Sequence, residues 1–190
     1  GVVIAQFFGA GNTCKMKRAI HNSIALTLVM GVVLTIVGLL FNDPILKAIG
    51  VPSEVFSEAS TYLSIYFWSL IFVMVYNMGS GILRSVGDSK RPLYFLIFSS
   101  VVNIILDFLF VKYFHFGVAG AGYATLIAQA ISAIMVMYVL MKTEDDYKVI
   151  LKEIGFDKEI LLKIIKIGLP TGFQQSIVSL SNVIVQSYIN

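Results

Sequence analysis

Long uncharged apolar runs are the feature that most limits what this chain can fold into. A helix that spans a bilayer needs about 20 consecutive, mostly apolar residues. Five runs reach that length, if the single acid Asp107 is accepted inside the third: 19–42, 59–83, 92–111, 113–141 and 167–190. The buried helices of a soluble protein rarely reach it so often. The runs therefore predict an all-α, polytopic membrane protein with five spans, preceded by the end of a truncated helix at 1–14.

The scarcity of charged side chains supports the same class. Only 13% of the residues are charged and the mean hydropathy is +0.86, whereas an average soluble domain has about 25% charged residues. A net charge of +3 does not favour a nucleic-acid partner. The one cysteine, Cys14, excludes a disulfide framework within the chain. Because both ends lie inside apolar runs, we expect an internal piece of a longer membrane protein.

Basic residues between the runs predict the orientation of the helices. The connections at 15–18, 84–91 and 142–166 are rich in lysine and arginine. The connections at 43–58 and 112–116, which alternate with them, hold one lysine each. Since basic connections stay in the cytoplasm, we expect 15–18, 84–91 and 142–166 on the cytoplasmic side of the cell membrane.

The connection at 142–166 also contains a helical pattern. Asp157 is a candidate N-cap, and lysines separate apolar residues that recur at helical spacing: Ile160, Leu161, Ile164 and Ile165. We expect a short amphipathic helix on the cytoplasmic surface, which Gly168 and Pro170 break or kink before the last span. The expected units are the helices of one half at 1–141, a connection at 142–166 and the first helix of a second half at 167–190.

One acid interrupts the apolar runs. Asn103 and Asp107 are four residues apart, so they lie on one helix face, about 40° apart in projection. An ionised Asp at the centre of a membrane helix costs about 2.5–3.5 kcal/mol, so Asp107 must face the protein interior or a wet cavity, or be protonated. Such an acid can exchange a proton or hold a cation such as Na+. The structural alternatives are a hydrogen bond to Asn103 alone, or a place near the outer interface, five residues before Lys112.

Uncharged polar residues form two further stripes. The last run carries a continuous stripe at spacings of three and four: Thr171, Gln175, Ser179, Asn182, Gln186 and Asn190. The run at 59–83 carries a looser one: Tyr62, Tyr66, Ser69, Tyr76, Asn77 and Ser80. Polar stripes line a cavity or a helix contact rather than face lipid tails, and mixed aromatic and polar groups suit a pocket for organic molecules. For the second stripe, the alternative is ordinary helix packing with an aromatic belt at the interface.

The run at 113–141 combines small and polar residues. Gly117, Ala121 and Thr125 are four apart, which lets another helix approach closely. Thr125 and Gln129 are more polar than packing requires. His21 and His115 have no ligand set around them, and the chain has no Walker A motif, so an enzyme or a resident metal is not favoured.

Five segments, taken in order, resemble the MATE (multidrug and toxic compound extrusion) family. They are GVVIAQFFGAGN at 1–12, GILRSVGDSKRP at 81–92, NIILD at 103–107, GVAGAGYAT at 117–125 and IGLP at 167–170. The similarity covers nearly the whole chain, and the three central segments in this order are specific. The resemblance implies half of a two-lobed, twelve-helix transporter plus the start of the second lobe, from the end of the second helix through most of the seventh.

The resemblance also implies an activity. MATE proteins export organic, often cationic, compounds in exchange for H+ or Na+. In the DNA-damage-inducible-F-like branch, an Asp and an Asn on the fifth helix and a Thr on the sixth are implicated in ion coupling, and Asp107, Asn103 and Thr125 match them. The NorM-like branch carries a glutamate within the seventh helix, whereas 167–190 contains no acid. This favours the first branch, whose other acid belongs to the first helix, outside this chain.

We therefore expect a secondary transporter of small organic cations, monomeric when full length, with H+ or Na+ as coupling ion and no cofactor. The residues expected to line the substrate cavity are Tyr76, Asn77, Ser80, Gln129, Gln175, Ser179, Asn182 and Gln186. One alternative is a lipid-linked oligosaccharide flippase of the wider superfamily, which should need a basic cavity, yet the runs contain no Arg or Lys. The other is a non-transporting membrane scaffold, which would tolerate apolar substitutions along the stripe at 167–190.

Overall fold

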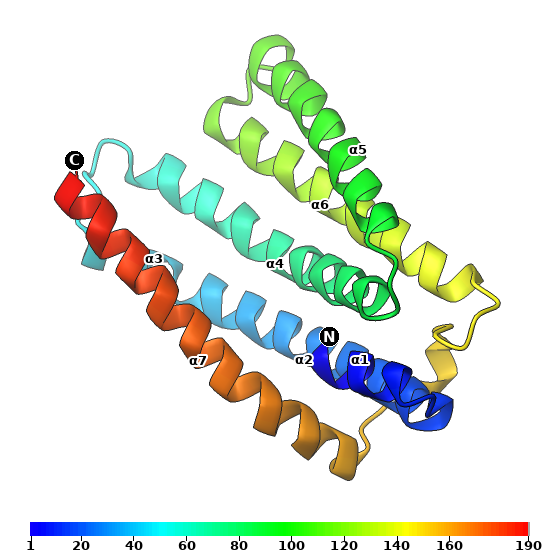
Figure 1. The fold of residues 1–190 in the computed structure, drawn as a ribbon. Helices are drawn as coiled ribbons and strands as arrows, with labels where there is room; N and C mark the ends of the chain where they lie inside the picture. Colours follow the sequence, from blue (N-terminus) through cyan, green and yellow to red (C-terminus); the bar gives the residue numbers. More distant parts are fainter. Residues whose placement is uncertain (190) are drawn as a thin grey trace.

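The chain forms a bundle of helices, which we describe from a computed structural model (Figure 1). The structure describes residues 1–189, without the side chains of Gln175, Leu180 and 182–189. All regular elements in this part of the chain are helical. In chain order they are α1 (Val2–Gly9), α2 (Thr13–Leu40), α3 (Asn42–Ile49), α4 (Phe56–Ser85), α5 (Lys90–Asp107), a π-helix (Phe108–Tyr113), α6 (Gly117–Lys142), a short 3-10 helix (Leu151–Glu153) and α7 (Lys158–Ile189).

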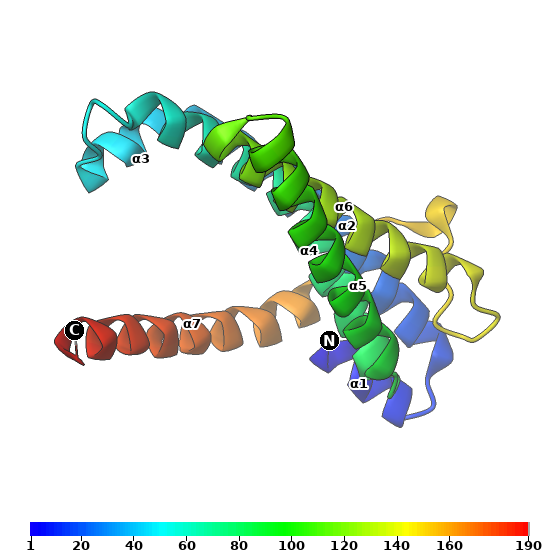
Figure 2. The same ribbon diagram turned by 90° about the horizontal axis from the view of Figure 1, so that it is seen from above.

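Helix α4 lies at the centre of the bundle. It packs along α2 on one side and α6 on the other, and α5 packs against α6. Helix α7 contacts α1 and α2 near its start, and it then runs away from the other long helices (Figure 2). The expected division into the helices of one half and the start of another stays a prediction.

Glycines bring α4 close to both neighbours. A Cβ atom at Gly79 of α4 would lie 2.8 Å from both methyl carbons of Val136 in α6. On the other side of α4, a Cβ at Gly38 of α2 would overlap the ring of Phe67. Small residues at such contacts let helix backbones approach closely, which is the main source of packing energy inside a bilayer.

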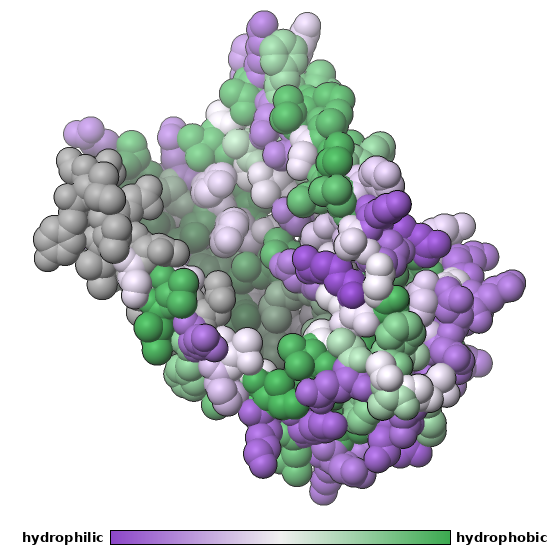
Figure 3. Space-filling view, in the orientation of Figure 1, coloured by the Kyte–Doolittle hydropathy of each residue, from purple (hydrophilic) through white to green (hydrophobic). Residues whose placement is uncertain are grey.

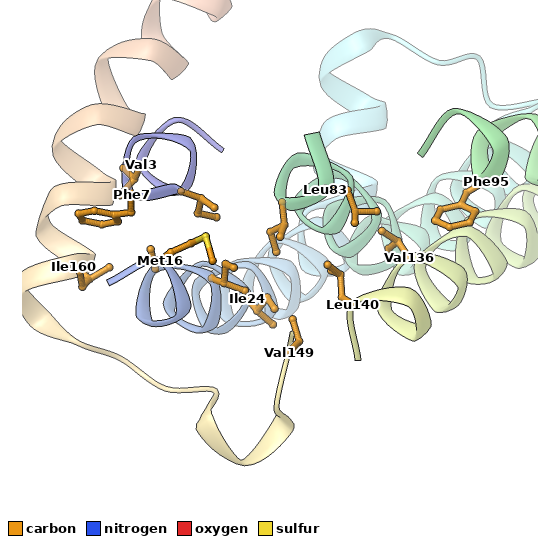
Figure 4. Packing of buried hydrophobic residues seen from close by; sticks show 14 residues of the cluster. Val3, Phe7, Met16, Ile24, Leu83, Phe95, Val136, Leu140, Val149 and Ile160 are labelled. Atoms are coloured by element: carbon orange, nitrogen blue, oxygen red, sulfur yellow. The ribbon is translucent and has the colours of Figure 1, made fainter. Parts of the chain in front are cut away.

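The best-packed core lies at one end of the bundle. Figure 4 shows side chains from several segments meeting there, among them Met16, Leu83, Leu140, Val149 and Ile160. Met16, Leu83 and Leu140 come from α2, α4 and α6, whereas Val149 comes from the connection after α6 and Ile160 from the start of α7. This core therefore fastens the connection and α7 to the bundle.

Polar contacts hold the same connection against the start of α2. The side chain of Asn22 donates a 2.8 Å hydrogen bond to the carbonyl oxygen of Asp157, and Arg18 lies 3.5 Å from the carboxylate of Asp157. The Nε2 atom of His21 accepts a 3.0 Å hydrogen bond from the backbone N–H of Ile150. We call Arg18, His21, Asn22, Ile150 and Asp157 the connection clasp.

Four of the five predicted spans are confirmed as helices long and apolar enough to cross a membrane: α2, α4, α5 with its π-helix, and α6. The fifth falls within α7, where several side chains lie outside the described residues, and its spanning role stays a prediction. The predicted N-cap is confirmed, because Asp157 Oδ1 accepts hydrogen bonds from the N–H groups of Glu159 and Ile160 at 3.0 and 3.3 Å.

Gly168 and Pro170 were expected to break or kink the helix, and the break is wrong. Helix α7 continues from Lys158 to Ile189 with Pro170 inside it. The expected amphipathic helix is therefore the first part of α7 rather than a separate element. Membrane helices accommodate proline because Ser and Thr hydroxyls can bond the carbonyls that it exposes. The Thr171 hydroxyl donates such a bond to Ile167 O at 2.8 Å.

Besides the short 3-10 helix at Leu151–Glu153, helix α3 and the π-helix were not predicted. Helix α3 occupies the lysine-poor connection at 43–58, and the Asn42 side chain ties it to α4 by a 2.7 Å hydrogen bond to Ser64. It ends at Gly50, which adopts a φ of 77° that an L-residue with a side chain rarely takes. The second element is the π-helix that follows Asp107.

Candidate functional site

Asp107 is the last residue of α5 before the π-helix begins. Its side chain is half-buried, and its Oδ1 atom is fully buried with no hydrogen-bond partner among the described residues. Buried carboxylate oxygens normally have partners, because an unpaired one costs free energy. Asp107 is therefore a group with an open position for a proton, a cation or a donor from another part of the protein.

Asn103 lies one turn before Asp107 on the same face of α5 and is also half-buried. Its Nδ2 atom is buried and has no hydrogen-bond partner in the described part of the chain. Within the described residues no hydrogen bond joins Asn103 to Asp107. Two unpartnered polar atoms, one donor and one acceptor, therefore lie one turn apart on a single helix face.

Thr125 lies on α6, the helix against which α5 packs. It is half-buried and comes three residues after Gly122, where a Cβ would lie 3.2 Å from Ile65 of α4. Residues three apart are neighbours on a helix surface, so Thr125 lies beside the α4 contact. The structure thus places α5 and α6 in contact, but no hydrogen bond links Thr125 to Asn103 or Asp107 in the described part of the chain.

The predicted cavity residues of α4 and α6 have mixed surroundings. The hydroxyl group of Tyr76 donates a 2.8 Å hydrogen bond to Pro92 O, which links α4 to α5. Asn77 is exposed, Ser80 is buried, and Gln129 is half-buried. Tyr76 therefore has a role in helix packing, which is the alternative that the sequence left open, and its place in a substrate cavity stays a prediction.

The predicted stripe of α7 is described only in part. Thr171 and Ser179 are exposed. The side chains of Gln175, Asn182 and Gln186 lie outside the described residues. Thr171 lines a cavity of about 340 Å³ between α1, α2, α4 and α7, together with Ser23 and Met78. One member of the stripe therefore reaches an internal space.

The charged residue nearest to Asp107 in the chain does not pair with it. Lys112 places its ammonium group over the ring of Phe108, 4.6 Å from the ring centre, and no ion pair within 4.0 Å joins it to Asp107 among the described residues. No group of three or more His, Cys, Asp or Glu side chains that could hold a metal ion occurs in the part of the chain that was described. A cation at Asp107 would therefore use this carboxylate with amide, hydroxyl or water oxygens.

The connection clasp was missed by reasoning from the sequence, which treated His21 as an isolated residue. His21 is only 4% exposed, and both of its ring nitrogens have hydrogen-bond partners. For the connection clasp, the only signal in the sequence was the pair His21–Asn22, next to a basic cluster at the start of an apolar run.

The connection after α6 contains a second polar contact. The Thr143 hydroxyl donates a 2.7 Å hydrogen bond to Asp145, and this bond, with a smaller contribution from Tyr147, lowers the pKa of the Asp145 carboxyl.

Comparisons with known proteins place the chain in a family. The MatE family model matches residues 1–109. The "Probable multidrug resistance protein YoeA" of Bacillus subtilis (strain 168) is 33% identical over all of this chain and 42% of its own length. The "Multidrug export protein MepA" of Staphylococcus aureus (strain MRSA252) is 27% identical over all of this chain, again across 42% of its own length. The chain thus spans less than half the length of these relatives.

Solved structures show the same arrangement of helices. A multidrug resistance MATE family transporter of the MOP superfamily, in an inward-facing conformation, matches with a TM-score of 0.82 and 31% identity, over 89% of this chain and 39% of that chain. A MATE structure in the bent conformation matches with a TM-score of 0.87 and 31% identity, over 94% of this chain and 40% of that chain.

Proposed function

The chain belongs to the MatE family, and from this premise we propose that the protein containing it is a secondary transporter. It exports small organic cations across the cell membrane in exchange for H+ or Na+. The names of its relatives, multidrug resistance and multidrug export proteins, support export rather than catalysis. The ion, the charge of the substrate and the monomeric state are parts of the proposal.

The unpartnered carboxylate of Asp107 carries this proposal. An ionised acid without a partner is costly in a membrane protein, so the group favours states in which a proton or a cation compensates its charge. When Asp107 is ionised, it attracts a cationic substrate. When it holds H+ or Na+, it no longer compensates the charge of the substrate, which is then released. Exchange follows because one carboxylate cannot serve both partners at once.

Asn103 and Thr125 complete the proposed ion site. Asn103 is one turn from Asp107 on the same face, and its buried Nδ2 has no hydrogen-bond partner among the described residues. A bound proton needs only the carboxylate, whereas Na+ needs several oxygen ligands, for which the Asn103 amide oxygen and the Thr125 hydroxyl are candidates. Further ligands would come from segments outside this chain, which covers 42% of its relatives.

The proposed orientation puts the connections 15–18, 84–91 and 142–166 in the cytoplasm. Lys17 lies 3.4 Å from Asp146 and Arg18 lies 3.5 Å from Asp157, so the first and last of these connections meet at one end of the bundle. Figure 3 shows hydrophilic residues gathered at that end. In this orientation Asp107 lies toward the outer end of α5, about 26 Å along the axis from Lys90.

The substrate cavity would lie between the two lobes, with the polar residues of α4, α6 and α7 on its walls: Tyr76, Asn77, Ser80, Gln129, Gln175, Ser179, Asn182 and Gln186. Uncharged polar and aromatic side chains suit organic cations, which need little hydrogen bonding and are attracted to aromatic faces. The absence of Arg and Lys from the apolar runs weighs against a flippase for an anionic lipid-linked oligosaccharide.

Efflux from cells tests this function. In the full-length protein, Asp107→Asn should abolish efflux of a fluorescent organic cation while insertion in the membrane is retained. Glu54→Gln, which removes an exposed acid from the connection before α4, is the matched control and should leave efflux unchanged. Efflux by the Asp107→Asn protein with normal ion dependence would remove Asp107 from the mechanism.

A further inference from the structure

Helix α5 changes its hydrogen-bond pattern directly after Asp107. The α-helix ends at Asp107, and the π-helix occupies Phe108–Tyr113. At its C-terminal end, the N–H of the capping residue Phe114 donates to Leu109 O, five residues earlier, at 3.1 Å. Single π turns in α-helices are rare and are frequent at functional sites. This π turn directly follows Asp107, the one acid in the apolar runs, so the contacts that produce the turn bear on the position of Asp107.

The π turn packs directly against Gly120 of α6. It is buried, and a Cβ atom there would lie 3.1 Å from Phe110 Cβ, 3.2 Å from the backbone carbonyl carbon of Phe110, and 3.1 Å from Phe116 Cβ. One of these atoms belongs to the backbone of the turn, so a rotation of a side chain cannot relieve the contact. An alanine at position 120 must therefore displace the turn itself.

The turn is also fixed from the side of the α5–α6 connection. The N–H of Phe116 donates to Phe110 O at 3.0 Å. The rings of Phe110, Phe114 and Phe116 pack together, with centroids 5.7 to 6.1 Å apart. The hydrogen bond and the ring packing hold the turn in one geometry, in which its backbone lies against Gly120.

Among the residues that the structure describes, by contrast, no side chain donates a hydrogen bond to the carboxyl group of Asp107. Its Oδ1 is unpartnered, and Lys112 is directed to the ring of Phe108. The direction of the carboxyl group is therefore set by the backbone of α5 and the turn that continues it. We propose that the π turn seated on Gly120 positions the carboxyl group of Asp107 for ion exchange, which makes Gly120 a positioning residue. This proposal rests on the proposed role of Asp107.

Gly122 supplies a matched control two residues away on α6. A Cβ there would lie 3.2 to 3.3 Å from Ile65, so it would be as crowded as at Gly120. Its neighbours, however, are side-chain atoms of α4 and not the π turn. Gly120→Ala and Gly122→Ala therefore add the same methyl group to the same helix, and only the first should displace the turn beside Asp107.

The test measures the carboxyl group directly, in the full-length protein reconstituted in liposomes. Dicyclohexylcarbodiimide labels protonated carboxyl groups in membranes, and mass spectrometry gives the fraction of Asp107 labelled at each pH. We expect Gly120→Ala to move the pH of half-maximal labelling by about one unit, and Gly122→Ala to leave it unchanged. Phe116→Ala loosens the same turn without adding an atom, and it should also move the midpoint if the Gly120→Ala protein does not accumulate.

Three outcomes would overturn the positioning role. They are an unchanged midpoint in Gly120→Ala, an equal shift in Gly122→Ala, and a wild-type Asp107 that is not labelled at any pH. The labelling does not depend on transport, so it is separable from the test of function. If Asp107→Asn retained ion-driven efflux, the proposed function would fail even where Gly120→Ala had moved the labelling midpoint.

Discussion

The backbone N–H of Ile150 donates a 3.0 Å hydrogen bond to Nε2 of His21, although 129 residues separate them in the chain. The Nδ1 atom of His21 lies 2.7 Å from Lys17 O. Because Nε2 accepts, the proton of a neutral ring is on Nδ1, which donates to that carbonyl oxygen. A buried, neutral histidine thus joins α2 to the connection that leads to α7, the first helix of the proposed second lobe.

Replacement of His21 should loosen this connection. We expect His21→Ala to leave the Ile150 N–H without its partner, which costs about 1–3 kcal/mol when such a group stays buried. Hydrogen exchange at residues 148–154 of the full-length protein should become about tenfold faster. His115→Ala is the control, because His115 is exposed. Equal exchange in both variants would show that the clasp does not depend on His21.

The contact between α4 and α6 should be sensitive to a single methyl group. Gly79→Ala would place its Cβ 2.8 Å from two carbons of Val136, a β-branched side chain with little rotamer freedom in a helix. We expect a loss of about 1–3 kcal/mol from overpacking, seen as a lower midpoint of thermal unfolding in detergent.

Gly81→Ala is the matched control for Gly79→Ala. It lies two residues away on α4, and no atom lies within 4 Å of a Cβ built there. We expect its unfolding midpoint to stay at or slightly above that of the wild type, since alanine favours helix more than glycine does. Equal midpoints for the two variants would contradict the close approach of α4 and α6.

Four spans could be predicted because a membrane-spanning helix requires a long uncharged apolar run, and the length of such a run can be counted in the sequence. The π turn could not, because the choice between bonds over four and five residues depends on packing against Gly120, thirteen residues beyond Asp107. The break at Gly168 and Pro170 was predicted from local propensity, and α7 shows that membrane helices can absorb a proline. The pairing of His21 with Ile150 depends on tertiary structure that no local pattern encodes.

The candidate site likewise combines features that local sequence predicts with features that depend on tertiary packing. The shared face of Asn103 and Asp107 follows from helical spacing alone. Oδ1 of Asp107 and Nδ2 of Asn103 are buried and lack hydrogen-bond partners among the described side chains, which depends on how α5 packs against α6. The hydrogen bond from Tyr76 to Pro92 O likewise could not be read from a polar stripe, which is equally compatible with a pocket and with a helix contact.

Substitutions in the polar stripe of α7 would distinguish a transporter from a membrane scaffold. In the full-length protein, Gln175→Leu and Gln186→Leu should each reduce growth in the presence of toxic organic cations. Ser176→Leu is the control, because it removes a polar group about 100° away from Gln175 around the helix. A scaffold would tolerate all three changes, and full resistance in both glutamine variants would favour it.

The central claim is that Asp107 couples an ion to the export of a substrate. Its most direct test is the ion flux that a substrate induces in liposomes containing the full-length protein, with pH and sodium gradients imposed separately. We predict a substrate-dependent flux of one of the two ions with the wild type and with Glu54→Gln, and none with Asp107→Asn. A substrate-dependent flux through Asp107→Asn equal to that of the wild type would contradict the account.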